Sequence, residues 1–181
     1  MLRFQRGEAA SLDLLLEKHR TPVIYFLHRM VGNRAVAEEL AQDTFLRVYR
    51  SQASYQPTAK FTTWLYRIAT NLAINWLRDH RHEKNGESLD APSASGLRPQ
   101  IVDPSPAADS ELQKQEMLRQ LRQAVAELPD RQRAAVLMHK YQGMELSQIS
   151  GALGCSLATV KSRLFRAYAT LRMRLAQPAA R

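Results

Sequence analysis

A stripe of aromatic, amide and guanidinium side chains runs along residues 61–78, whose sequence is FTTWLYRIATNLAINWLR. Its members follow one another at spacings of three, four, three and four residues: Trp64, Arg67, Asn71, Ile74 and Arg78. Helical periodicity places residues with that spacing on one edge of a helix. An indole ring can stack on a flat partner, an amide can hydrogen-bond to it, and guanidinium groups can pair with anions. The stripe therefore predicts a contact surface.

The same segment carries an apolar face beside that stripe. At 100° per residue one arc contains Phe61, Leu65, Ile68, Leu72 and Trp76, which is the pattern of a helix that packs on a core. We therefore expect a helix that is buried along one side and offers the adjoining edge to a partner.

Residues 156–176 combine a predicted buried stripe with a polar outward face. The apolar stripe comprises Val160, Leu164, Ala167, Tyr168, Leu171 and Leu175. The outward side presents Thr159, Ser162, Phe165, Arg166 and Ala169, with Lys161 and Arg163 on its flanks. Such a helix can enter a DNA major groove, where arginine reads guanine and lysine holds phosphate. The alternative is an ordinary amphipathic helix with a solvated basic face.

Composition indicates a polyanionic partner and excludes several classes of site. The 181 residues carry a formal net charge of +9, and 45% of them are apolar, so the chain can form a packed core. The single cysteine, Cys155, excludes an internal disulfide and a multi-thiolate zinc site. His80 and His82 point away from each other on a helix, and no motif for a nucleophile or a phosphate loop occurs. We therefore expect a protein without enzymatic activity, cofactor or metal.

The elements that must position these surfaces are helical throughout. Apolar spacing of three and four residues predicts an all-α chain, with helices over residues 11–31, 34–52, 61–78, 112–128, 130–141, 146–153 and 157–176. Pro22 is expected to kink or split the first helix, and Gly32 and Asn33 to end it. The last two helices, joined by Gly154, Cys155 and Ser156, are typical of a helix-turn-helix.

The helix over residues 34–52 has a core side and an acidic side. The core side comprises Ala37, Leu40, Ala41, Thr44, Phe45 and Val48, and the other side Glu38, Glu39, Gln42, Asp43, Leu46 and Arg50. In a basic chain, the acidic side favours docking of a basic partner helix with Leu46 as the apolar anchor. A solvated acidic face is the alternative.

Residues 86–111 read as a flexible linker rich in proline, serine and alanine, because four of the eight prolines fall there. The linker divides the chain into a first domain, residues 1–85, and a second domain, residues 112–177. Its acidic charge opposes that of the rest of the chain. No secretory signal and no stretch long and apolar enough to cross a membrane is evident, so we expect a soluble, cytoplasmic protein without membrane insertion.

The combination of AEELAQDTFLRVYR, FTTWLYRIATNLAINWLR, LPDRQRAAVLMHKYQG and GCSLATVKSRLFRA resembles the bacterial RNA polymerase sigma factors of the extracytoplasmic-function group. The resemblance covers nearly the whole chain. It implies a transcription initiation factor that binds core RNA polymerase and promoter DNA, and an anti-sigma factor as a further partner. A homodimeric helix-turn-helix repressor or activator is the alternative.

The resemblance also implies roles for individual residues. It places Glu39, Gln42, Asp43 and Leu46 at the core polymerase interface. It places Asn71 at a flipped base of the minus-ten element, with Tyr55, Trp64, Arg67 and Arg78 nearby. It assigns reading of the minus-thirty-five element to Thr159, Lys161, Ser162, Phe165 and Arg166. The departures from the pattern are Glu145, where a hydroxyl cap is usual, Ala158, where glycine is usual, and Tyr168, where a second arginine often follows. Gly151 inside a predicted helix costs about 1 kcal/mol unless close packing requires it.

An energy comparison predicts that the chain melts DNA only together with polymerase. Opening about ten base-pair steps costs roughly 14 kcal/mol at about 1.4 kcal/mol per step. Each base stacked on an aromatic ring returns about 1 to 3 kcal/mol, and few aromatic side chains are placed to help. Free protein should therefore not open a promoter.

Overall fold

Eight helices account for the regular structure that a computed structural model describes over residues 1–8, 10–86 and 106–176. They are α1 (Leu2–Gln5), α2 (Ala10–Val31), α3 (Arg34–Arg50), α4 (Phe61–Gly86), α5 (Pro106–Ala126), α6 (Asp130–Tyr141), α7 (Leu146–Leu153) and α8 (Leu157–Ala176). Those residues contain no strand, so the predicted all-α class is confirmed.

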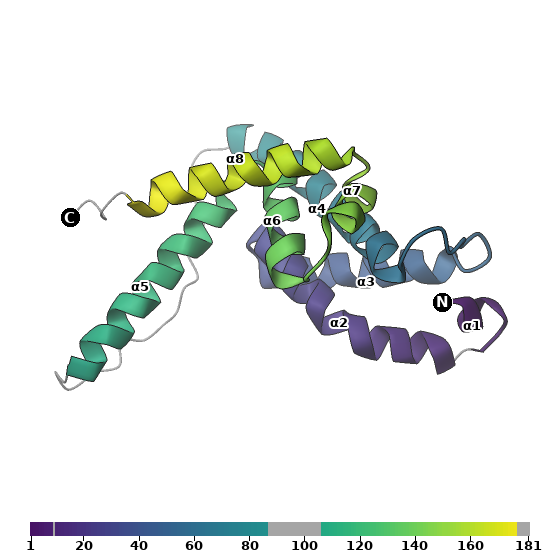
Figure 1. Ribbon diagram of the computed structural model, residues 1–181. Helices are drawn as coiled ribbons and strands as arrows, with labels where there is room; N and C mark the ends of the chain where they lie inside the picture. Colours follow the sequence, from purple (N-terminus) through teal and green to yellow (C-terminus); the bar gives the residue numbers. More distant parts are fainter. Residues whose placement is uncertain (9, 87–105, 177–181) are drawn as a thin grey trace.

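The first domain is built from α1 to α4, with α2, α3 and α4 packed on one another (Figure 1). The predicted core side of α3 is confirmed, since all six of its members are buried. They meet a buried cluster on α2, of which Val23, Phe26 and Leu27 are at most 1% exposed. Leu65 and Leu72 of α4 close this core.

Several predicted boundaries of the first domain differ from the structure. Helix α2 continues through Pro22 without a break, because the adjoining Val23 and Phe26 are held in the core and compensate for the one backbone hydrogen bond that proline removes. Asn33 does not end α2 in a left-handed conformation; it caps α3, and its side-chain oxygen accepts from the Val36 N–H at 3.3 Å. Helix α4 runs past Arg78 to Gly86. The short helix α1 was not predicted.

The second domain is the helix-turn-helix unit that the sequence predicts, preceded by two further helices. Gly143 and Gly154 both adopt left-handed φ angles, of 59° and 58°, where α6 and α7 end. The Ser156 hydroxyl accepts from the Thr159 N–H at 3.2 Å and so caps α8. The N-cap position of α7 is occupied by Glu145 instead of a hydroxyl residue. The Gln148 side chain accepts a hydrogen bond from the Glu145 N–H at 2.9 Å, as in a capping box.

Helix α5 begins at Pro106 rather than near Leu112, so the end of the predicted linker is helical. Proline suits the first turn of a helix, where its missing N–H costs nothing. The remainder of the predicted linker, residues 87–105, lies outside the described residues. In Figure 1, α5 projects away from the body and diverges from α8.

The two domains pack against each other through a third face of α4 that the sequence pattern did not reveal. Thr63, Tyr66 and Thr70 on this face are at most 5% exposed, and α4 packs against α7 while α2 packs against α6. The Tyr66 hydroxyl donates to Oε1 of Gln142 at 2.5 Å. A Cβ at Gly151 of α7 would lie 2.9 Å from Cγ2 of Thr63, so close packing explains this helical glycine.

Candidate nucleic-acid interfaces

The predicted stripe on α4 lies at the surface of the first domain. Arg67, Asn71 and Arg78 are exposed and Trp64 is half-buried. Arg67 and Asn71 make no side-chain hydrogen bond with any other described residue, whereas Nε of Arg78 donates to Asp79 at 3.1 Å. One face of α4 packs on the core of the first domain and another packs against the second domain. The stripe lies on neither face, so it remains available to a partner.

Tyr55 packs against Trp64 from the buried side and is not part of the exposed stripe. The two rings are tilted against each other with centroids 4.9 Å apart, and Phe61 completes the cluster at 5.9 Å from Trp64. Tyr55 is only 8% exposed, and burial raises the pKa of its hydroxyl. The structure therefore brings Tyr55 and Trp64 together, but it leaves little of the Tyr55 ring free to stack on a base.

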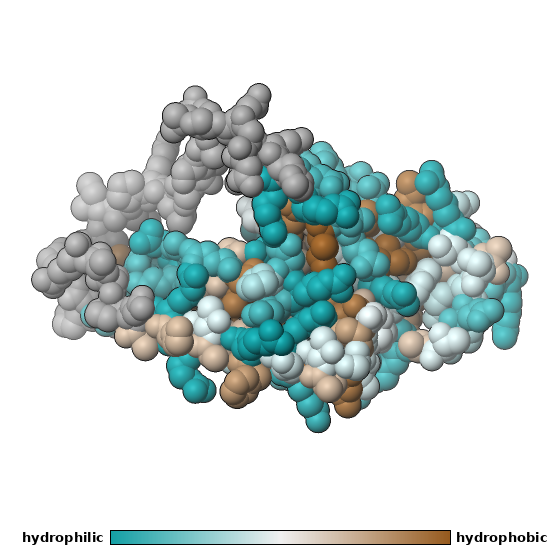
Figure 2. All heavy atoms as spheres, turned by 90° about the horizontal axis from the view of Figure 1, so that it is seen from above, coloured by the Kyte–Doolittle hydropathy of each residue, from teal (hydrophilic) through white to brown (hydrophobic). Residues whose placement is uncertain are grey.

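The outward face of α8 carries solvent-exposed side chains. Phe165 is 76% exposed, and Lys161 and Arg166 are exposed beside it, while Thr159 and Ser162 are half-buried. A guanidinium nitrogen of Arg166 donates to the Ser162 hydroxyl at 2.8 Å, which orients both groups outward. Figure 2 looks down on the side of the molecule where α8 lies, and this side is largely hydrophilic with scattered apolar side chains.

The predicted buried stripe of α8 holds for four of its six members. Val160, Leu164, Ala167 and Leu171 are buried. The prediction is wrong for Leu175, which is 41% exposed because it lies near the end of α8, where α5 and α8 diverge. Tyr168 packs against the core but is only half-buried, and its hydroxyl is hydrogen-bonded to Nδ1 of His139 at 3.0 Å.

The acidic side of α3 forms a third exposed surface. Glu39, Gln42 and Asp43 are exposed and make no side-chain hydrogen bond or ion pair with another described residue. Leu46 is 43% exposed at the same face. Glu38, on the same face, accepts a hydrogen bond from Nε of Arg34 at 3.0 Å. Unpaired carboxylates around one apolar side chain fit a basic partner helix.

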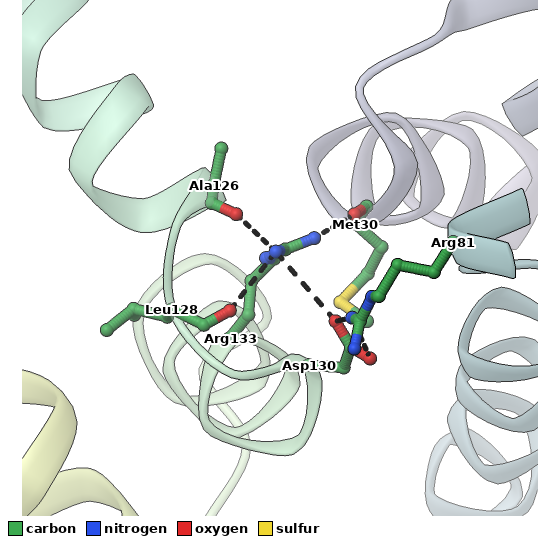
Figure 3. Close-up of polar contacts among 6 residues, drawn as sticks. All are labelled: Met30, Arg81, Ala126, Leu128, Asp130 and Arg133. Atoms are coloured by element: carbon green, nitrogen blue, oxygen red, sulfur yellow. Dashed lines mark hydrogen bonds and ion pairs between the residues drawn. The ribbon is translucent and has the colours of Figure 1, made fainter. Parts of the chain in front are cut away.

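A buried arginine that sequence reasoning missed joins the two domains (Figure 3). Arg133 is 8% exposed, and burial lowers the pKa of its guanidinium. It donates to the carbonyl oxygens of Met30, near the end of α2, of Ala126, the last residue of α5, and of Leu128, just after α5. Asp130 lies 3.9 Å from it and accepts two hydrogen bonds of 2.7 Å from Arg81 of α4. Arginine is usually exposed, so an arginine in the first turn of α6 does not reveal from the sequence that it is buried.

The described residues hold no group of three or more histidine, cysteine or acidic side chains arranged for a metal ion. None of the helices described combines the length and hydrophobicity that a bilayer crossing requires.

Comparison with known proteins assigns both domains. Residues 15–83 match Sigma-70 region 2, and residues 118–171 match Sigma-70, region 4. The chain is 34% identical over 173 residues to the RNA polymerase sigma factor CarQ of Myxococcus xanthus, a match that covers 95% of this chain and 93% of CarQ. It is 31% identical over 175 residues to the ECF RNA polymerase sigma factor SigW of Bacillus subtilis, covering 94% and 92% of the two chains.

A solved structure supports the fold. The sigma factor RpoE of Bartonella quintana, crystallised with the anti-sigma factor NepR, superposes with a TM-score of 0.68 at 21% identity, over 91% of this chain and 96% of RpoE. The relatives match across both domains and are sigma factors, which are not enzymes, and this does not favour a dimeric repressor. The chain therefore belongs to the extracytoplasmic-function group of the sigma-70 family and is a promoter-specific transcription initiation factor of RNA polymerase.

Proposed function

We propose that each of three exposed surfaces of this initiation factor binds a different partner or promoter element. The acidic side of α3 docks on core RNA polymerase through Glu39, Gln42, Asp43 and Leu46. The edge of α4 formed by Trp64, Arg67, Asn71 and Arg78 reads and opens the minus-ten element, with Tyr55 supporting Trp64 from below. The outward face of α8 reads the minus-thirty-five element through Thr159, Lys161, Ser162, Phe165 and Arg166. The observation that carries the proposal is the availability of all three faces while the rest of each helix is packed.

The chemistry of each surface supports its assignment. Asn71 offers an amide with no partner among the described residues, which can hydrogen-bond to the edge of an unpaired base. Phe165 and Arg166 lie together at the exposed face of α8, where a ring can contact a thymine methyl group and a guanidinium can read guanine. The carboxylates of α3 repel DNA, so their partner is a protein surface.

Reading two promoter elements requires the domains to separate. Elements about 25 base pairs apart lie roughly 80 Å apart along B-DNA, whereas α4 and α7 are in contact here. The 19 residues between α4 and α5, residues 87–105, can span roughly 60 to 70 Å at full extension, and the 21 residues of α5 add about 1.5 Å each along the helix. We propose that the packed arrangement belongs to the free protein and that it opens when core polymerase binds.

The proposal extends to the cellular location and to a further partner. The protein works in the cytoplasm, where polymerase and promoters are found, and we assign no catalytic step to it. The complex of Bartonella quintana RpoE with the anti-sigma factor NepR supports an anti-sigma factor as a partner of this chain too.

Run-off transcription tests the proposal. Core polymerase is supplied with a library of promoters, with and without the purified protein. We expect transcripts that require the protein and share two sequence elements. A footprint over an inverted repeat in the absence of polymerase would favour a repressor instead.

A further inference from the structure

The short helix α1 is hydrogen-bonded to the loop that joins α3 and α4, residues 51–60, which we call the α3–α4 loop. Nε2 of Gln5 donates to the carbonyl oxygens of Tyr55 at 3.2 Å and Ala53 at 3.4 Å. In the other direction, Nε2 of Gln52 donates to the Phe4 carbonyl oxygen at 2.6 Å. All three hydrogen bonds join residues 48 or 50 positions apart in the chain.

Phe4 anchors α1 so that Gln5 can reach the loop. Its side chain is only 5% exposed, and its ring lies 5.8 Å from the ring of Tyr49 near the end of α3. An apolar anchor next to a polar contact fixes the direction of the Gln5 side chain, which in solution would have several rotamers.

Apart from the buried Tyr55 ring, the middle of the α3–α4 loop has few contacts that hold it. Its own hydrogen bonds are local: the Thr58 N–H donates to Gln56 at 2.9 Å, and the Ser54 hydroxyl donates to Ser51 at 3.3 Å. Within the part of the chain that the structure describes, residues 53–59 are tied to another element by hydrogen bonds from Gln5 only. Loops with so few bonds are the segments that open most easily.

The α3–α4 loop carries the Tyr55 side chain, against which Trp64 packs. The Tyr55 ring supports the Trp64 ring at a centroid distance of 4.9 Å, and the Tyr55 carbonyl is the better bonded of the two acceptors of Gln5. We infer that Gln5 is a positioning residue, whose amide holds the α3–α4 loop so that Tyr55 keeps Trp64 oriented toward minus-ten DNA. The inference rests on the proposed role of Trp64 and extends it to an N-terminal helix.

A spectroscopic experiment tests the positioning step alone. Gln5→Glu keeps the shape of the side chain but removes both N–H donors and sets a carboxylate against two carbonyl oxygens. In a Trp76→Phe background Trp64 is the only tryptophan, and its quenching by acrylamide measures its accessibility. We expect stronger quenching in Gln5→Glu. The matched control is Gln56→Glu, which adds the same charge at an exposed position of the same loop and should leave quenching unchanged.

A transcription experiment tests the consequence. Run-off transcription with core polymerase compares two promoters that differ by one minus-ten base. Gln5→Glu should reduce discrimination between them about fivefold, the equivalent of one hydrogen bond of about 1 kcal/mol. Affinity for core polymerase and the melting temperature should change little. Gln52→Glu removes the reciprocal donor and provides a second variant if Gln5→Glu does not fold.

The outcomes separate the inference from the proposed function. Unchanged Trp64 quenching in both Gln5→Glu and Gln52→Glu would overturn the inference. Altered quenching in Gln5→Glu with full promoter discrimination would overturn it too. The variant Trp64→Ala reports on the proposed function independently: if it keeps full discrimination, the assignment of Trp64 to the minus-ten element fails, whatever Gln5 does. Altered quenching together with reduced discrimination, absent from Gln56→Glu, supports the inference.

Discussion

Replacing Gly151 with alanine should open the packed domains of the free protein. Gly151 lies inside α7, and the added Cβ would stand 2.9 Å from Cγ2 of Thr63 on α4, well inside normal contact distance. Thr63 is 5% exposed and β-branched, so its methyl group has little freedom to move away. Overpacking of this kind costs about 1 to 3 kcal/mol.

That cost acts on the contact between domains and not on the second domain itself. Alanine is the better helix former by about 1 kcal/mol, but this gain is the same whether the domains are packed or apart, because α7 is helical in both. The closing equilibrium should therefore shift toward the open form by about 5- to 150-fold, as 1 to 3 kcal/mol implies. If core polymerase binds only the open form, its apparent affinity rises by up to the same factor.

Small-angle X-ray scattering of the free chain measures opening, and a titration with core polymerase measures affinity. Gly151→Ala should increase the radius of gyration and tighten polymerase binding. Thr63→Ser removes the clashing methyl group and keeps the hydroxyl, so adding it to Gly151→Ala should reverse both effects, with a coupling energy of about 1 to 2 kcal/mol. Purely additive effects of the two substitutions, or an unchanged radius of gyration, would contradict a steric clash between Gly151→Ala and Thr63.

Four further substitutions test the surfaces and the link between domains. Asn71→Ala should slow open-complex formation about fivefold, through loss of one hydrogen bond of about 1 kcal/mol, with polymerase affinity retained; equal loss of both would count against a base contact. Arg166→Ala should weaken recognition of the upstream element by about 1 to 3 kcal/mol, and unchanged promoter preference would contradict this. Asp43→Lys should reduce polymerase affinity about tenfold, or 1.4 kcal/mol, in a pull-down titration. Arg133→Met should lower the urea unfolding free energy by about 3 kcal/mol, because two buried carbonyl oxygens and one partly buried carbonyl oxygen lose their charged donor; a loss below about 1 kcal/mol would show that water replaces the donor.

Much of the local structure could be predicted because its causes are local. The core side of α3 follows from apolar spacing, since a helix with that pattern can bury only one face. The turn before α8 follows from Gly154, which accepts a left-handed conformation, and from Ser156, which caps the helix that follows. The exposed position of Phe165 follows from its place opposite the buried stripe of α8.

The tertiary structure alone decided which surfaces meet. Gln5 and Tyr55 lie 50 positions apart, and Arg133 and Met30 lie 103 positions apart, so no helical period relates them. A periodicity shows that a face is apolar or polar, but it does not show which element covers that face. For this reason the helices and their outward groups follow from local sequence patterns, whereas the burial of Tyr55, the place of Arg133 between two helix ends and the contact of Gly151 with Thr63 arise only when the chain packs.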